Sequence, residues 1–119
     1  MSVIDDDESI RESLPDLIRQ FGFVVEAFES AETFLASGAT SRTSCLVLDV
    51  AMPGMSGIDL QRELLERGQK IPIIFITANP DKSIRARLIA QGAVDCLVKP
   101  FGETALLDAL STVFPGRQT

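Results

Sequence analysis

Cys45-Leu46-Val47-Leu48-Asp49-Val50-Ala51-Met52-Pro53-Gly54 is the stretch of sequence that decides how this chain folds. Its apolar run has no polar alternation, which indicates a strand buried on both faces, as in a parallel sheet covered by helices. The run ends in Asp49 and then breaks into a Pro/Gly turn. A carboxylate at the end of a buried strand is costly unless a cation meets it. The stretch therefore predicts a buried strand over residues 45–49 and a charged partner for Asp49.

Four further segments have the composition of short strands, and helical patterns alternate with all five strands. The other strands are expected over residues 2–6, 24–28, 71–76 and 95–98. The helical patterns span residues 10–21, 30–38, 56–67, 79–92 and 103–113. This alternation predicts an α/β fold, a three-layer sandwich around a five-stranded parallel sheet. Because crossovers are right-handed, few topologies remain, and the flavodoxin-like strand order 2-1-3-4-5 is the default for five βα units.

Capping residues set the expected helix starts. Ser30 and Ser56 each precede a helical pattern and predict an N-cap. Asn79 with Pro80 predicts a third start, with the proline at the first helical position. The side chains of that helix expected to face the core are Ile84, Leu88 and Ile89.

The composition narrows the possible classes of function. The chain has 119 residues, the size of one domain, and its 17 acidic and 11 basic residues give a net charge of −6. Lys and Arg are scattered, so direct binding of nucleic acid, which needs a basic patch, is not expected. The charge instead suits metal ions or basic partner surfaces. Histidine is absent, which excludes histidine acid/base catalysis and most zinc sites.

The cysteines and the hydropathy indicate the compartment. Cys45 and Cys96 lie in apolar strand-like runs and are interpreted as reduced core residues, with a buried disulfide as the alternative. Acidic residues begin at Asp5, where a secretory signal would need an apolar run. No stretch approaches the roughly 18 uncharged apolar residues of a membrane span. We therefore expect a cytoplasmic domain with no membrane partner.

Polar and charged side chains stand at the ends of four expected strands. They are Asp5, Asp6, Asp49, Thr77 and Lys99. In a sheet of this topology, ligands bind outside the carboxyl ends of the strands, so these side chains are expected at one edge. Clustered carboxylates repel unless a cation bridges them, and two or three carboxylates completed by water favour Mg²⁺ over a fully caged Ca²⁺. A lysine and a hydroxyl beside a metal suit a phosphoryl group, which a carboxylate can accept as an aspartyl phosphate.

Each of these residues also has an ordinary structural interpretation. The acids from Asp5 onward could merely complement the dipole of the helix that follows them. Asp49 could be a turn aspartate, and Lys99 could be a surface lysine. Taken singly, these ordinary interpretations are preferred. Convergence of the whole set at four strand ends favours a site that handles a phosphoryl group.

Four motifs accompany these residues in a fixed order along the chain. They are Asp5-Asp6, Leu48-Asp49 with Met52-Pro53-Gly54-Met55-Ser56-Gly57, Ile76-Thr77-Ala78, and Gly92-Ala93 through Lys99-Pro100-Phe101. Over essentially the whole chain, this set resembles the CheY-like receiver domain of bacterial two-component response regulators. Residues 30–35 and 93–95 further resemble the FixJ-like branch, in which a receiver usually precedes a helix-turn-helix DNA-binding domain.

The resemblance implies how the phosphoryl group is handled. Asp49 is the phosphoacceptor, and the donor is a phosphohistidine of a partner sensor histidine kinase. Lys99 pairs with the phosphoryl oxygens, and Thr77 donates its hydroxyl to them once they are in place. Backbone N–H groups of Ala51 and Ala78 assist.

The resemblance also implies a metal site. Asp6, Asp49 and the backbone carbonyl of Ala51 bind Mg²⁺ directly, while Asp5 acts through water. The peptide bond between Lys99 and Pro100 is expected to be cis.

Two positions depart from the family pattern. The family often has Tyr or Phe at the switch position where this chain has Cys96, and a thiol cannot act as a ring that turns inward when Thr77 moves. We therefore expect signalling to depend on movement of the 77–80 loop and the following helix, with Cys96 preferred as core packing. Ala51, expected near Asn79, has no side chain that could orient or block the water that removes the phosphoryl group. The sequence therefore does not predict how long the phosphorylated state lasts.

The leading interpretation is a phosphorylation-controlled switch that catalyses only its own phosphorylation and dephosphorylation. Transfer to Asp49 is expected to change the face formed by the fourth helix, fifth strand and fifth helix, and thereby to control dimerisation and a transcriptional output. Residues 1–119 are expected to be a single receiver domain. It either stands alone or was separated from a DNA-binding half that is absent here.

Three other interpretations remain open. A Mg²⁺-dependent phosphohydrolase of the haloacid dehalogenase type would need a second aspartate where Ala51 stands. A flavodoxin-like nucleotide binder would need a Ser/Thr/Gly-rich phosphate loop where this chain has acids. A phosphorylation-independent interaction module is disfavoured by the complete set of acids, threonine and lysine.

Overall fold

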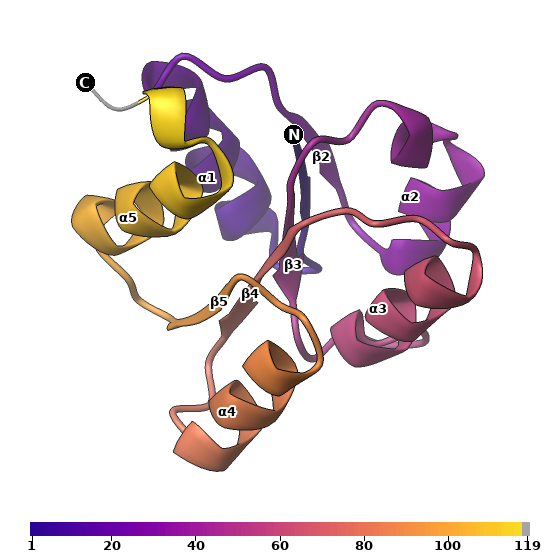
Figure 1. Ribbon diagram of the computed structural model, residues 1–119. Coiled ribbons are helices and arrows are strands. Elements are labelled where there is room, and N and C mark those ends of the chain that lie inside the picture. The colour runs from indigo at the N-terminus through magenta and orange to yellow at the C-terminus, as the bar shows by residue number, and fades with distance from the viewer. Residues whose placement is uncertain (118–119) are drawn as a thin grey trace.

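Five parallel strands form the centre of the computed structural model, which describes residues 1–117 (Figure 1). They are β1 (Ser2–Ile4), β2 (Glu26–Phe28), β3 (Leu46–Asp49), β4 (Ile73–Thr77) and β5 (Asp95–Val98). Their order in the sheet is β2-β1-β3-β4-β5, and every neighbouring pair is parallel. The predicted strand order is confirmed. Because all strands run the same way, their carboxyl ends share one edge of the sheet.

Helices cover both faces of this sheet. They are α1 (Glu8–Gln20), α2 (Ala31–Ala36), α3 (Gly57–Glu66), α4 (Lys82–Ala90) and α5 (Glu103–Val113), with short 3₁₀ turns η1 (Ala39–Ser41) and η2 (Pro115–Arg117). Helices α1 and α5 lie on one face, and α2, α3 and α4 lie on the other (Figure 1). This arrangement gives the predicted three layers. No helix within residues 1–117 has the length and hydropathy that a membrane span requires.

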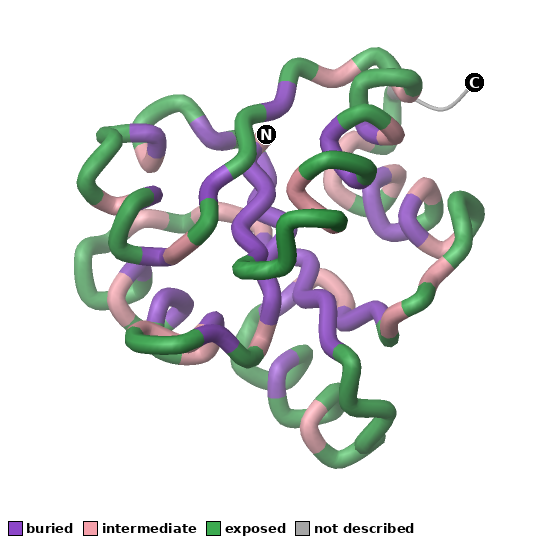
Figure 2. The backbone as a smooth tube through the Cα atoms, turned by 180° about the vertical axis from the view of Figure 1, so that it is seen from behind, coloured by how far each residue is buried: buried purple, intermediate pink, exposed green. Residues whose placement is uncertain are grey.

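The central strand β3 is buried on both sides. Leu46 and Leu48 pack toward α2, α3 and α4, whereas Cys45 and Val47 pack toward α1 and α5. The strands at the centre of the molecule are buried along their length (Figure 2). Cys96 belongs to the opposite layer from Cys45, and both cysteines are free. The alternative of a buried disulfide is therefore wrong, because the sheet separates the two thiols.

Strand β1 ends at Ile4 rather than at residue 6, and two other strands begin two residues later than predicted. β2 begins at Glu26 rather than at residue 24, and Val24 is 86% exposed. β4 begins at Ile73 rather than at residue 71. Pro72 has no N–H to donate to a neighbouring strand. Its carbonyl accepts the N–H of Leu46 at 2.9 Å, so this carbonyl is the only part of its backbone that can pair with β3.

Asp81, and not Asn79, caps α4. The Oδ1 atom of Asp81 accepts the backbone N–H of Ser83 at 2.8 Å and its hydroxyl at 2.7 Å. The side chain of Asn79 instead accepts the N–H of Asp81 at 3.1 Å, which makes a turn before the helix. The prediction that Pro80 occupies the first helical position is therefore wrong. Asp and Asn are both good caps, and their order along the chain does not say which one the helix uses.

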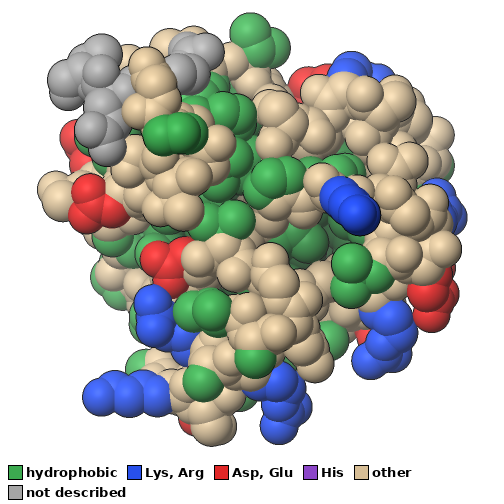
Figure 3. All heavy atoms as spheres, viewed as in Figure 1, with side chains coloured by type: hydrophobic (Ala, Val, Ile, Leu, Met, Phe, Trp, Pro, Cys, Tyr) green, Lys and Arg blue, Asp and Glu red, His purple; other side chains and the backbone are tan. Residues whose placement is uncertain are grey.

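Helix α4 exposes more of its surface than predicted. Leu88 is fully buried, but Ile89 is 36% exposed and does not join the core. Adjacent positions on a helix point about 100° apart, so only one of the pair faces the sheet. The helix also carries Lys82, Arg85 and Arg87 and no acidic residue. Lys and Arg side chains gather over the lower part of the molecule, where α4 lies (Figure 3).

Candidate functional site

Three carboxylates meet at the carboxyl edge of the sheet. Oxygens of Asp5, Asp6 and Asp49 all lie within 4.8 Å of one another. Asp5 and Asp6 follow β1, Asp49 ends β3, and the register pairs Ile4 with Leu48. Parallel pairing of β1 with β3 thus brings together side chains more than forty positions apart in the sequence. These are the three carboxylates predicted to cluster.

The three carboxylates differ in burial. Asp5 has no exposed surface, Asp49 is 5% exposed and Asp6 is exposed. One oxygen of Asp5 accepts the backbone N–H of Asp7 at 2.9 Å. Its other oxygen, Oδ2, is buried and accepts no hydrogen bond from residues 1–117. A buried charged oxygen without such a donor needs a cation nearby.

Lys99 supplies a positive charge. Its Nζ atom lies 2.8 Å from Asp5 Oδ2 and 3.7 Å from Asp49 Oδ2. The shorter distance makes a close ion pair between the ammonium group of Lys99 and the buried carboxylate of Asp5. Burial disfavours the ammonium form of Lys99, but the neighbouring carboxylates of Asp5, Asp49 and Asp7 outweigh this effect and raise its pKa. Lys99 therefore stays charged at neutral pH.

The protein by itself balances the negative charge of the Asp49 carboxylate only in part. Burial, together with the negative charge of Asp5, raises the pKa of Asp49 to about 7, although Lys99 acts in the opposite direction. An additional cation would restore its ionised form. The all-oxygen donor set of the three clustered carboxylates fits a hard divalent cation such as Mg²⁺.

Thr77 lies at the same edge of the sheet. It ends β4, the neighbour of β3, and it is 5% exposed. Its Oγ1 accepts the N–H of Asn79 at 3.0 Å, so the hydroxyl proton can still be donated to another acceptor. The N–H of Lys99 donates to the carbonyl of Thr77 at 2.7 Å, which ties the ends of β4 and β5 together. Ala51 and Ala78, the two predicted backbone contributors, follow β3 and β4 and are exposed.

The loop after Asp49 closes on itself. The N–H of Gly57 donates to the carbonyl of Val50 at 3.0 Å. A Cβ on Gly57 would overlap the carbonyl oxygen of Asp49, so this close approach requires glycine. Ser56 and Asp59 then form the capping box that begins α3, each accepting the other's backbone N–H at 3.1 Å. Backbone contacts therefore fix the position of Asp49.

Cys96 packs in the core. It is 3% exposed and belongs to the same apolar cluster as Leu48, Phe75 and Leu88. Burial raises the pKa of its thiol. Cys96 and Thr77 line one hollow of about 490 Å³ between the start of α4 and β5.

Arg11 belongs to the site but was not predicted. Its guanidinium donates to the backbone carbonyl of Asp5 at 3.0 Å. A basic residue near the start of a helix opposes the helix dipole, and this local conflict is the signal that could have identified it. Asp7 caps the same helix by accepting the N–H and the hydroxyl of Ser9. The predicted cis peptide between Lys99 and Pro100 is present.

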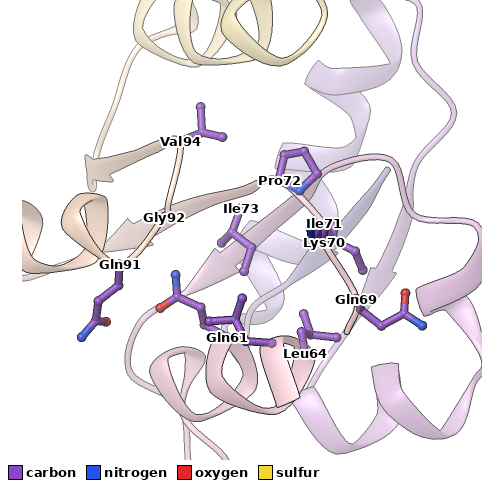
Figure 4. Close-up of a pocket in the computed structure, with 11 residues that line it drawn as sticks. Gln61, Leu64, Gln69, Lys70, Ile71, Pro72, Ile73, Gln91, Gly92 and Val94 are labelled. Atoms are coloured by element: carbon purple, nitrogen blue, oxygen red, sulfur yellow. The ribbon is translucent and has the colours of Figure 1, made fainter. Parts of the chain in front are cut away.

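A second hollow lies far from these carboxylates. It has a volume of about 340 Å³ and lies at the amino edge of the sheet, where β4 and β5 begin (Figure 4). Glutamines line it over an apolar floor that includes Leu64 and Ile73, and its charged residue is Lys70. No carboxylate lines this hollow. Carboxylate chemistry therefore belongs to the opposite edge.

Comparisons with known proteins agree with this geometry. Residues 1–111 match the family described as response regulator receiver domain. The response regulator protein TodT of Pseudomonas putida is 47% identical over 108 residues, which cover 91% of this chain and 48% of TodT. The transcriptional regulatory protein FixJ of Rhizobium meliloti is 39% identical over 108 residues, which cover 91% of this chain and 53% of FixJ. The chain thus spans about half the length of these relatives.

Solved structures give the same result. The response regulator StyR superposes with a TM-score of 0.86 at 48% identity, covering 96% of this chain and 58% of the StyR chain. The FixJ-N crystal structure superposes with a TM-score of 0.83 at 35% identity, covering 97% of this chain and 92% of that chain. The match over residues 1–111, the CheY-like strand order and the acidic cluster at the carboxyl edge lead to one conclusion. The chain belongs to the receiver domain family of response regulators.

Proposed function

We propose that this domain is a phosphorylation-controlled switch in which Asp49 accepts a phosphoryl group from a phosphohistidine of a sensor kinase. The observation that carries the proposal is the position of Asp49, nearly buried beside Lys99 and inside a cluster of three carboxylates. In the transfer, a carboxylate oxygen of Asp49 bonds to phosphorus. The bond between phosphorus and the imidazole nitrogen breaks, and that nitrogen leaves with the electron pair.

The acidic cluster would hold Mg²⁺. Asp6, Asp49 and the backbone carbonyl of Ala51 are the proposed direct ligands, and Asp5 is the proposed partner of a bound water. The raised pKa of Asp49 and the all-oxygen donor set support this assignment. When bound, the ion neutralises negative charge on the carboxylates and on the phosphoryl oxygens.

The remaining residues of the site would orient the phosphoryl group. Lys99 is held by Asp5 at 2.8 Å and faces Asp49, so its ammonium group can pair with a phosphoryl oxygen. The hydroxyl of Thr77 and the backbone N–H groups of Ala51 and Ala78 would donate hydrogen bonds to the other oxygens. Thr77 ends β4, and Ala51 and Ala78 closely follow β3 and β4, so these donors would be positioned at the carboxyl edge of the sheet, as phosphoryl transfer requires.

The kinase would dock beside Lys99. A hollow of about 440 Å³ runs between α1 and the segment after β5, and its apolar lining includes Ile10, Leu17 and Phe101. Lys99 lies at this hollow as well. A helical partner seated there would bring its phosphohistidine toward Asp49. The apolar hollow beside Lys99 therefore supports a protein as the donor of the phosphoryl group.

Phosphorylation would be read on the face formed by α4, β5 and α5. A Thr77 hydroxyl drawn toward the phosphoryl group would pull the 77–80 loop, which leads directly into α4. Val98 on this face is 38% exposed, and α4 is basic. We propose that a second copy binds this face and that dimerisation controls a transcriptional output through a DNA-binding half outside this sequence. The similarity to FixJ of Rhizobium meliloti, a transcriptional regulatory protein, supports that output.

Intact-mass measurement tests the proposal. The protein is incubated with acetyl phosphate and Mg²⁺, and one added phosphoryl group is expected. Asp49→Asn should remain unmodified, whereas Asp108→Asn, an exposed aspartate on α5, should be modified like the wild type. Chelation of Mg²⁺ should abolish the addition.

Two results would contradict the proposal. An unmodified wild type would remove the acceptor role, and equal modification of Asp49→Asn would place the phosphoryl group elsewhere. Turnover of a free phosphoester substrate would instead favour a phosphohydrolase of the same fold.

A further inference from the structure

Glu32 reaches the phosphoacceptor loop from a different part of the chain. It lies in the first turn of α2, and its Oε2 atom accepts the backbone N–H of Met55 at 3.2 Å. The two residues are 23 positions apart. The carboxylate of Glu32 therefore links α2 to the loop that follows Asp49.

A second observation shows how closely Glu32 covers this loop. Gly54 has a φ of +74°, and a Cβ added to it would lie 2.6 Å from Oε2 of Glu32. The backbone at Gly54 is thus turned toward the carboxylate and leaves no room for a side chain while the carboxylate keeps its place.

The rest of the loop is held differently. At its start the N–H of Val50 donates to the carbonyl of Ile76, and at its end the N–H of Gly57 donates to the carbonyl of Val50. Met52 is 8% exposed and anchors the loop in the core. Within residues 1–117, the contact with Glu32 is the hydrogen bond that the structure gives to the loop tip at residues 53–55.

We propose that Glu32 is a positioning residue for phosphoryl transfer, an inference that rests on the proposed function. By fixing the tip at Met55, Glu32 restrains the backbone of the loop that contains Ala51. The carbonyl of Ala51 is the proposed metal ligand, and its N–H is a proposed phosphoryl contact. Glu32 touches neither the metal nor the phosphoryl group, so its effect passes through the backbone.

Three variants separate positioning from simple stability. Glu32→Ala removes the acceptor, while Glu32→Gln keeps a side-chain oxygen that can accept the same N–H. Glu29→Ala is the matched control, because Glu29 is an exposed glutamate three residues earlier and lies outside α2. For each variant, amide hydrogen exchange at Gly54 and Met55 is measured by NMR without metal. Phosphorylation by acetyl phosphate is then measured over a range of Mg²⁺ concentrations.

Glu32→Ala should accelerate exchange at Met55 about fivefold, the effect of losing one modest hydrogen bond, without faster exchange in the core strands. It should also raise the half-saturating Mg²⁺ concentration about threefold, because a less restrained loop holds the carbonyl of Ala51, the proposed metal ligand, less firmly in place. Glu32→Gln should restore most of both properties, and Glu29→Ala should match the wild type.

Other outcomes overturn the inference in distinguishable ways. If the wild type is phosphorylated and Glu32→Ala has an unchanged Mg²⁺ dependence, Glu32 has no positioning role, whatever its effect on stability. Unchanged exchange at Met55 in Glu32→Ala would equally remove the role. A wild type that takes up no phosphoryl group would instead contradict the proposed function, and the exchange measurement would still report whether Glu32 orders the loop.

Discussion

The ammonium nitrogen of Lys99 lies 2.8 Å from Oδ2 of Asp5, a carboxylate with no exposed surface. The same nitrogen is 3.7 Å from Asp49. One lysine thus faces two buried carboxylates, and the exposed Asp6 adds a third acid to the cluster. If all four groups are ionised, three negative charges and one positive charge leave a net charge of −2. A divalent cation would balance that charge.

Replacing Asp49 with Asn should stabilise the metal-free protein at alkaline pH. Burial and the charge of Asp5 raise the pKa of Asp49 from 3.8 to about 7 in the folded chain. The folded chain then binds this proton more tightly than the unfolded chain, so Asp49 lowers the free energy of unfolding as the pH rises from 3.8 through about 7. At pH values near 8, Asp49→Asn should therefore be more stable by about 2–4 kcal/mol, since one pKa unit corresponds to about 1.4 kcal/mol.

The measurement is urea unfolding in EDTA, and the control is the same comparison near pH 4, where the two proteins should be about equally stable. Saturating Mg²⁺ should narrow the gap at alkaline pH, because it binds the carboxylate but not the amide. A gap that is independent of pH would show that the charge of Asp49 does not cause it.

Lys99→Ala should destabilise the fold and slow phosphorylation. The variant leaves the buried carboxylate of Asp5 without its cation, which should cost about 2–4 kcal/mol in the free energy of unfolding above neutral pH. Loss of a preorganised charge beside the acceptor should lower the rate with acetyl phosphate about tenfold or more. Lys82→Ala, which removes an exposed lysine from α4, is the control and should change neither value. A Lys99→Ala protein with wild-type rate would exclude Lys99 from the transfer.

Gly57→Ala should be strongly destabilising. The added methyl group would meet the carbonyl of Asp49 and the backbone of Val50, neither of which can rotate away. Overpacking of this kind costs about 1–3 kcal/mol or more. Gly116→Ala is the matched control, because a Cβ there meets nothing within 4 Å. Thermal unfolding of the two variants gives the answer, and equal midpoints would mean that the loop after Asp49 is not tightly closed.

Enlarging the two cysteines should have unequal effects. Cys96 lines the hollow of about 490 Å³ beside Thr77, so the ring in Cys96→Phe has space and should cost less than about 1 kcal/mol. Cys45 is fully buried against α1 and α5, so Cys45→Phe should cost about 3 kcal/mol or more. Urea unfolding compares the two, and equal losses would show that the hollow beside Cys96 cannot accept a ring.

Much of the fold follows from local sequence. The unbroken apolar run before Asp49 predicts a strand buried on both faces, and alternation with amphipathic helices predicts the parallel sheet and its order. Once that order holds, Asp5 and Asp49 must end neighbouring strands, so their convergence could be predicted too. Patterns of this kind depend on residues within a few positions of one another. They can therefore be recognised in a single sequence.

Other features depend on packing between distant segments, and only the tertiary structure decided them. Asp5 and Asp6 are adjacent and identical in type, yet one is fully buried and the other exposed, because only one of two successive side chains turns into the sheet edge. The contact between Glu32 and Met55 spans 23 positions and exists because α2 packs beside the loop after β3. Sequence determined which groups reach the edge of the sheet. The packing of helices against that edge determined which of them are buried and which of them hold the loop around Asp49.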